Sequence, residues 1–250
     1  MSLLPSLTGI VVELGAAGRL VACTEYCDPG RDLPRVAWDG ARGAEAILRL
    51  KPDLVLKQAG RKADDPLRDT LRAAGVAVVA VPSETMADVR GAITAVGEAL
   101  GRREAAGAFL KRFDADLEAA REGVRGRPAP TVLFVFHRDP GKVANVMGAG
   151  PGTFLDELIR FAGGRNALEG FTTPYPQVRL EDLVRIKPEV IVDNLASEED
   201  PASAWAAFAE AGVPAVVEGR IRVVRDNALL IPGPHLPRSV ARMVELIHGG

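Results

Sequence analysis

The chain of 250 residues is poor in the residues that build metal centres and disulfide frameworks: it holds only two cysteines and three histidines. The cysteines, Cys23 and Cys27, have no second Cys or His pair at the spacing of a structural zinc site. A disulfide between them needs a tight local loop, because the two Cα atoms must come close. We therefore expect two buried or partly buried free thiols, with redox or metal use as the alternative.

A strong charge of one sign and long apolar runs are also missing. The formal net charge is −2, which gives no reason to expect nucleic acid or an acidic membrane surface as a partner. No apolar run approaches the length that spans a bilayer. No basic start followed by a hydrophobic core is visible either, so the sequence shows no secretory signal.

The beginning of the chain leaves two interpretations open. The second half has the apolar run 132–136 before its first expected helix, whereas the first half has only residues 1–4. Either the first strand is very short, or the sequence starts downstream of a removed leader.

Signatures of catalysis are absent from the sequence. It contains no nucleophile elbow, phosphate-binding loop, dinucleotide fingerprint or His-Glu-x-x-His motif. Glycines gather in 148–152, but this run contains a proline and no following lysine. We expect it to be a flexible connection that gives access to the backbone at a helix start. These absences favour a binding protein over an enzyme, and no cofactor is expected.

What the sequence does have is an internal repeat. Residues 45–56 read EAILRLKPDLVL and residues 181–192 read EDLVRIKPEVIV. Each copy predicts a short helix that ends before proline, which cannot continue a helix and favours an extended residue before it. The branched apolar run that follows predicts a strand buried on both faces of a parallel sheet. Because matching segments flank both copies in the same order, we predict an α/β fold of two similar lobes with mainly parallel sheets and a ligand cleft between them.

One long amphipathic stretch sets the predicted boundaries. Apolar residues recur at helical spacing from about 103 to 125, so we predict an N-terminal lobe over 1–102, a bridging helix over 103–126 and a C-terminal lobe over 127–250. A packed bridging helix favours small rocking of the lobes over a wide hinge. Strands are expected near 20–22, 53–56, 76–81, 131–136, 189–193, 214–217 and 221–224, and helices near 44–50, 65–74, 83–100, 153–162, 180–186, 201–211 and 237–248.

Three aromatic residues and two histidines are candidates for a ligand site. Tyr26, Trp38 and Tyr175 fall outside helical or strand periodicity, and the repeat places Trp38 and Tyr175 at equivalent points, one in each lobe. His137 follows the strand 131–136 and so lies at the carboxyl edge of a sheet, where α/β proteins bind ligands. His235 precedes the last helix. For both histidines, a loop residue hydrogen-bonded to water is the plainer interpretation.

Other candidates lie at expected helix starts. Two of them lie near Thr8 and Thr153, where free N–H groups could hold a ligand. Thr153 and Asp156 have the spacing of a capping box, and Thr85 is a capping candidate for the helix near 83–100. Glu45 and Glu181 are each expected to begin a repeat helix, where a carboxylate favours the positive end of the helix dipole. Their symmetric placement suggests instead two acidic contact points for a two-fold symmetric partner.

Five further motifs stand beside the two Lys-Pro repeats: residues 5–8 (PSLT), 24–28 (TEYCD), 150–158 (GPGTFLDEL), 162–166 (AGGRN) and 174–178 (PYPQV). Taken together, these motifs resemble a known family, the helical-backbone substrate-binding proteins of ABC importers. The cobalamin-binding type is most similar, with ferric-siderophore binders near it. The resemblance covers essentially the whole chain and implies a receptor that captures a large chelate between two lobes and delivers it to a membrane permease.

The resemblance also implies roles for individual residues. Trp38 and Tyr175 match the aromatics that cradle a corrin ring, and Tyr26 matches a cleft aromatic. Glu45 and Glu181 match the glutamates that dock onto arginines of the two permease subunits.

Two further positions complete the prediction. Asp226 falls where a ligand-contacting acid occurs in the family, and His235 stands where many relatives carry an arginine. The resemblance implies a monomeric, non-enzymatic protein that binds cobalamin or a related corrinoid for an ABC permease dimer, outside the cytoplasm. The alternatives are a ferric-siderophore or haem binder of the same fold, and a cytoplasmic corrinoid carrier or metallochaperone-type enzyme.

Overall fold

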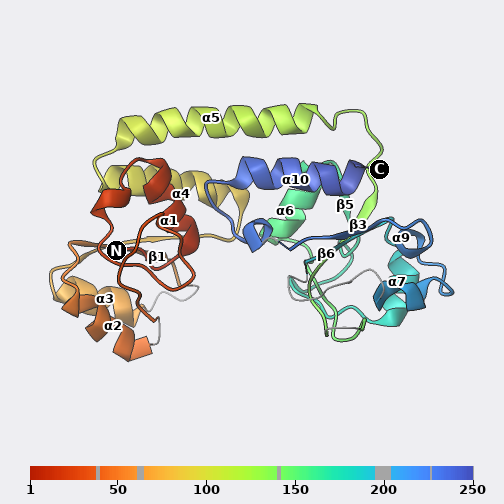
Figure 1. Ribbon diagram of the computed structural model, residues 1–250, viewed down its shortest axis with the longest axis horizontal. Coiled ribbons are helices and arrows are strands. Elements are labelled where there is room, and N and C mark those ends of the chain that lie inside the picture. Colours follow the sequence, from red (N-terminus) through yellow and green to blue (C-terminus); the bar gives the residue numbers. More distant parts are fainter. Residues whose placement is uncertain (38–39, 61–64, 140–141, 195–203, 226, 250) are drawn as a thin grey trace. The chain divides into compact units, whose positions relative to one another are not determined.

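The computed structural model describes residues 1–37, 40–60, 65–139, 142–194, 204–225 and 227–249 (Figure 1). The chain divides into two compact units, Met1–Ala115 with Ile231–His235, and Asp116–Leu230 with Leu236–Gly250. The division falls within α5 (Arg103–Glu122), the long helix expected from the sequence. None of the helices described is both long and apolar enough to cross a membrane.

The first unit is built on two parallel strands, β1 (Leu54–Gln58) and β2 (Ala77–Val81). The strand expected near 20–22 is reduced to one bridged residue, Cys23, which pairs with Ser2 and Arg35. Apolar side chains of α2, α3 and both strands form the core of this unit. The helical segments are α1 (Pro5–Glu13), η1 (Ala17–Arg19), α2 (Gly40–Arg49), α3 (Pro66–Ala73) and α4 (Met86–Ala99).

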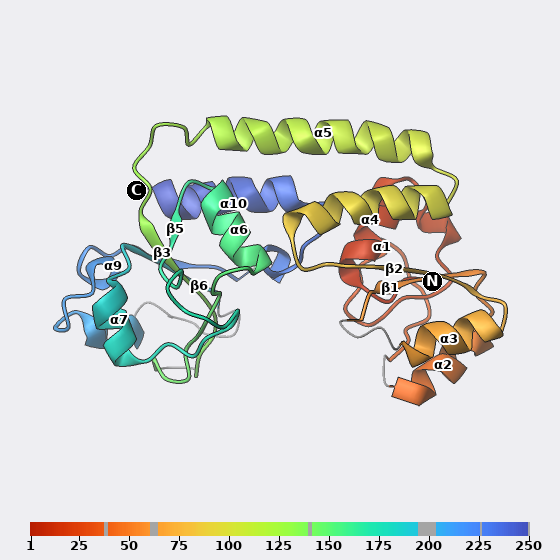
Figure 2. The same cartoon turned by 180° about the vertical axis from the view of Figure 1, so that it is seen from behind.

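The second unit holds a sheet in the order β4-β3-β6-β7, with β5 paired to β3. All pairings are parallel except that of β4, so the predicted α/β class with mainly parallel sheets is confirmed. The helices α6 and α10 pack side by side (Figure 2). The strands are β3 (Thr131–His137), β4 (Met147–Gly148), β5 (Arg165–Asn166), β6 (Val190–Asp193) and β7 (Ile221–Val223). The helical segments are α6 (Phe154–Phe161), α7 (Leu180–Ile186), η2 (Ala206–Phe208), α9 (Pro214–Val217), η3 (Asn227–Leu230) and α10 (Leu236–His248).

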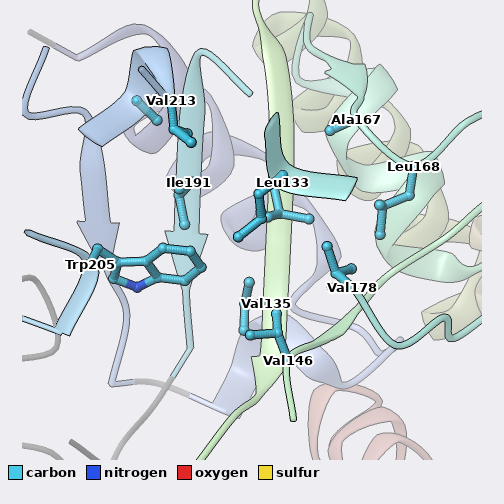
Figure 3. Packing of buried hydrophobic residues seen from close by; sticks show 11 residues of the cluster. Leu133, Val135, Val146, Ala167, Leu168, Val178, Ile191, Trp205 and Val213 are labelled. Atoms are coloured by element: carbon cyan, nitrogen blue, oxygen red, sulfur yellow. The ribbon is translucent and has the colours of Figure 1, made fainter. Parts of the chain in front are cut away.

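Figure 3 shows the main apolar core of the second unit. Leu133 and Val135 lie two residues apart in β3 and therefore share one face of the sheet. Ile191 of β6 packs beside them, and the indole of Trp205 is completely buried in the same cluster. Burial of each large apolar side chain contributes about 1.5–3 kcal/mol, so this core fixes the strand ends that carry the candidate site.

Both repeat helices end at a lysine in the left-handed conformation. The φ angle is 45° at Lys51 and 44° at Lys187. We expected an extended residue before each proline, and this was wrong, because the left-handed conformation also avoids the α region that proline disfavours. It turns the chain sharply from helix to strand. Since positive φ is uncommon outside glycine, its presence in both copies shows that the repeat is structural.

The strand expected at 214–217 is a wrong prediction, because this segment is the helix α9. Pro214 occupies the first helical position, where its fixed φ already matches a helix. Strand pairing resumes only at β7, with Ile221 opposite Ile191. In the helix expected over 201–211, the described residues 204–211 hold a short helical turn that runs into η2.

Candidate functional site

The carboxyl end of β3 brings two predicted ligand-binding residues to one edge of the second unit. His137 ends the strand with an exposed side chain. Its neighbour Phe136 meets Tyr175 edge-on, with ring centroids 5.5 Å apart and ring planes at 85°. Tyr175 is still 46% exposed. An aromatic pair of this kind adds about 0.5–1.5 kcal/mol beyond area burial, so the Tyr175 ring is supported from one side and open to a ligand on the rest of its surface.

Two glycines hold the segment that carries Tyr175. The amide of Gly148 donates to the Pro176 carbonyl at 3.1 Å, and that of Gly150 donates to the Pro174 carbonyl at 2.8 Å. A Cβ atom on Gly150 would lie 2.6 Å from a backbone carbonyl oxygen of this segment. We expected a flexible connection here, and that expectation was wrong: the glycines form a close-packed support. Sequence reasoning missed it because the partner segment lies far along the chain.

A buried ion pair lies behind the same edge. The Arg138 Nε donates to Asp193 Oδ2 at 2.8 Å, and neither side chain is exposed. The indole N–H of Trp205 donates to the same carboxylate oxygen at 2.7 Å. Arg138 also donates from Nη1 to the carbonyls of Asp139 and Lys142, both at 3.1 Å. The pair therefore joins the ends of β3 and β6 and fixes the loop that follows His137.

The first unit has a comparable pair at the carboxyl end of β1. The Lys57 ammonium lies 2.6 Å from Asp65 Oδ2 and donates to the Gln58 carbonyl at 2.9 Å. Asp65 is also the N-cap of α3 and accepts from the Arg68 amide at 3.1 Å. Burial by itself would raise the pKa of Asp65. The hydrogen bonds from Lys57 and from the Arg68 amide outweigh it and hold that pKa below its ordinary value.

The remaining aromatic and polar candidates are distributed as follows. Tyr26 lies in a tight turn and is 78% exposed. His235 is half-buried, directly before α10, and belongs to the first unit. Trp38 and Asp226 lie outside the described residues. The described residues thus bring His137 and Tyr175 to one edge, and their roles, like those of the other candidates, stay predictions.

The two threonines are engaged within their own helices. The amide of Thr8 donates to the Leu4 carbonyl at 3.0 Å inside α1, and its side chain is fully buried. The N–H of Thr8 itself is thus used inside the helix, and ligand binding by the N–H groups at the helix start near Thr8 stays a prediction. Thr153 caps α6, as its spacing to Asp156 predicted. Its hydroxyl accepts from the Asp156 amide at 3.1 Å and donates to the Gly150 carbonyl at 2.9 Å.

The two repeat glutamates are exposed but not equivalent. Glu181 lies in the first turn of α7, as expected. Glu45 lies in the middle of α2, so the expected helix-start position was wrong for this residue. Glu45 pairs with Arg49 at 2.7 Å. In the second copy, Arg185 pairs with Asp182 instead, at 2.9 Å. The hydrogen bond from Arg185, followed by one from a backbone amide, lowers the pKa of Asp182.

A metal centre finds no support in the described part of the chain, where no three His, Cys, Asp or Glu side chains converge. The carboxyl end of β3 in the second unit instead offers an exposed imidazole and a half-exposed aromatic ring. Such a surface suits the binding of a flat, partly apolar molecule.

Comparison with known proteins gives consistent matches. The pattern that describes the family "periplasmic binding protein" matches residues 1–227. A cobalamin-binding protein of Halobacterium salinarum (strain ATCC 29341 / DSM 671 / R1) is 28% identical over 267 residues, covering 99% of this chain and 69% of the relative. A vitamin B12-binding protein of Yersinia pestis (strain Pestoides F) is 29% identical over 211 residues, covering 82% of this chain and 72% of the relative. Among solved structures, the periplasmic heme-binding protein BhuT in complex with two hemes is 32% identical, with a TM-score of 0.83 and coverage of 98% of this chain and 96% of that one.

Proposed function

Because the chain belongs to the periplasmic binding protein family, whose members carry ligands, we propose that it binds cobalamin or a related corrinoid for an ABC importer. The observation that carries the proposal is the likeness, across 99% of this chain, to a protein named for cobalamin binding. The proposal includes that the chain catalyses no reaction and that the corrinoid is cargo, not a cofactor.

In this proposal one aromatic side chain from each lobe contacts the corrin ring. Tyr175 supplies the aromatic face of the C-terminal lobe, and its contact with Phe136 holds the Tyr175 side chain in place. Trp38 supplies the face of the N-terminal lobe. A rigid aromatic surface loses little conformational entropy on binding, so most of the gain from apolar burial becomes affinity.

The other predicted residues surround this cradle. Tyr26 and His137 are exposed and lie on a turn and a strand end, which suits contact with the edge of a large ligand. His235 and Asp226 belong to the same predicted set. Thr8 and Thr153 act through the loops that their helices hold in place, since both side chains are buried.

Delivery to the permease falls to the two exposed glutamates. Glu45 and Glu181 occupy matching places in the sequence repeat. Each lobe would therefore contact one subunit of a two-fold symmetric permease through its glutamate. The protein would act as a monomer outside the cytoplasm, where the permease accepts its cargo.

Haem binding is the second candidate, and one observation favours it. The solved structure that is 32% identical to this chain is a haem-binding protein. Exposed Tyr26 and His137 side chains are both of the type that ligates haem iron.

A competition experiment separates the two. The purified chain is dialysed against equal concentrations of cyanocobalamin, hemin and a ferric hydroxamate siderophore, and the retained ligand is identified by mass spectrometry. The proposal predicts retention of cyanocobalamin; retention of hemin would replace it with the second candidate.

A further inference from the structure

The two cysteines of the chain form a close pair in the turn that carries Tyr26. Both are free and buried. The turn closes with a hydrogen bond of 3.1 Å from the Cys27 amide to the Thr24 carbonyl. The Thr24 hydroxyl lies 3.1 Å from Cys27 Sγ. Burial raises the pKa of the Cys23 thiol, and a hydrogen bond with the Cys27 thiol adds to this. The closed turn therefore brings the two cysteine residues close together.

A single arginine holds this turn together. Arg35 Nη1 donates to the carbonyls of Cys27 and Thr24, at 2.6 and 3.0 Å, and to Cys23 Sγ at 3.2 Å. A fixed positive charge against the sulfur opposes the binding of a metal cation at this place. The same charge lowers the pKa of the Cys23 thiol, but burial and the neighbouring Cys27 outweigh it, so attack on a disulfide needs a pH at which some thiolate forms. The surroundings of the pair thus suit thiol–disulfide chemistry better than metal binding.

We propose that Cys23 and Cys27 are a redox-active pair that closes to an intrachain disulfide around Thr24–Tyr26. The oxidant is a small-molecule or protein disulfide. The Cys27 thiolate, the less deeply buried of the two, attacks the oxidant, forms a mixed disulfide and releases one thiolate. The Cys23 thiolate then attacks the Cys27 sulfur, forms the intrachain bond and releases the second thiolate. Two protons leave the protein thiols, and the two electrons end on the reduced oxidant.

The disulfide would act on Tyr26. This residue lies inside the closed loop and is 78% exposed, while the bridges of Cys23 to Ser2 and Arg35 anchor one end of the loop. Closing the ring restricts the backbone on both sides of Tyr26. If Tyr26 contacts the ligand, which rests on the proposed function, the redox state sets how freely it does so.

The experiment uses the full chain and oxidised glutathione at about pH 8, where a useful fraction of thiolate exists. Trypsin releases both cysteines in the single peptide Leu20–Arg31. We expect two reactive thiols before treatment and none after, and a peptide lighter by two hydrogen atoms without bound glutathione. Two thiols that persist in the native chain, or a stable glutathione adduct on the unsubstituted chain, would overturn the proposal.

Two variants make the order of steps testable. Cys23→Ser should keep glutathione on Cys27 as a stable mixed disulfide, because the second attack is removed. Cys27→Ser should react at least tenfold more slowly, because Cys23 is fully buried. Equal rates in the two variants would contradict the assigned order. Should either variant fail to fold, the thiol count and peptide mass of the unsubstituted chain still decide. All readouts need no ligand, so a failure here is distinct from a failure of corrinoid binding.

Discussion

At the scale of single residues, both copies of the repeat place a buried, paired charge at the same position, although its sign differs. Lys57 and Asp193 hold the same place in the two copies and carry opposite charges. Each is buried and paired, Lys57 with Asp65 and Asp193 with Arg138. In both units the ion pair lies at the carboxyl end of a strand and stabilises the segment near that end. The sequence could not predict this, because each partner comes from a loop whose position depends on the folded structure.

The Arg138–Asp193 pair is predicted to be essential for stability. Arg138→Met leaves a buried carboxylate without its counter-charge and should lower the free energy of unfolding by about 3–5 kcal/mol. Urea unfolding followed by circular dichroism measures the change. Arg242→Met, which removes an exposed pair with Glu245, is the control and should cost no more than about 1 kcal/mol. Equal losses in the two variants would refute a special role for the buried pair.

Tyr175 is predicted to supply an aromatic face to the corrinoid. Tyr175→Ala should weaken cyanocobalamin binding at least tenfold, which corresponds to about 1.4 kcal/mol, and adding Trp38→Ala should weaken it further. Tyr175→Phe keeps the ring and its contact with Phe136, and should retain the affinity. Isothermal titration gives the dissociation constants. Unchanged affinity in the alanine variants would refute the proposal that these aromatic side chains hold the corrin ring.

At the scale of elements, local signals in the sequence predicted helix ends well. Thr153 and Asp156 cap α6 as their spacing indicated, and Thr85 forms a capping box with Asp88 at the start of α4. These signals succeed because the hydrogen bonds join residues within one turn. The prediction of a strand at 214–217 was wrong because it followed the apolar pattern alone, whereas Pro214 starts a helix. The sequence did not predict that Gly150 supports the segment of Tyr175, because the two segments lie far apart along the chain.

The start of α3 is predicted to make stability depend on pH. The pKa of Asp65 is lower in the folded chain than its ordinary value, so its ionised form stabilises the fold above the unfolded pKa of about 3.9. This contribution is lost as the pH falls through the folded pKa. Asp65→Asn keeps a cap but leaves Lys57 buried without its partner.

Urea midpoints of the two chains should therefore differ most at about pH 7, and the difference should shrink as the pH falls below about 3.9. A second variant, Asp69→Asn, removes an exposed carboxylate of the same helix and should show little difference at either pH. A constant gap between Asp65→Asn and the unsubstituted chain across this range would contradict the assigned ionisation.

At the scale of the whole molecule, the chain passes between its two units more than once. The first boundary falls within α5, and the segment Ile231–His235 belongs to the first unit although α10 belongs to the second. Within the first unit, a Cβ atom on Gly9 would lie 3.0 Å from the Pro234 ring, so this segment packs closely on α1. The sequence repeat predicted two α/β halves but gave no sign of this return. The boundaries 1–102, 103–126 and 127–250, and the small rocking of the lobes, stay predictions.

The proposed delivery to a permease would need both halves of the chain. Replacing both Glu45 and Glu181 by arginine should abolish stimulation of the permease ATPase while leaving corrinoid affinity within about twofold, because both residues are exposed. Glu218→Arg, at another exposed position of the second unit, is the control and should stimulate normally. A double variant that still couples would refute the docking assignment.

The most direct test of the central claim is isothermal titration of the purified chain with cyanocobalamin. We predict saturable one-to-one binding with a dissociation constant of about 1 μM or below, equivalent to about −8.2 kcal/mol. The same chain should show much weaker binding of hemin and of a ferric hydroxamate siderophore. Absence of heat and of saturation with cyanocobalamin, together with tight binding of hemin, would contradict the claim and assign the cradle to haem.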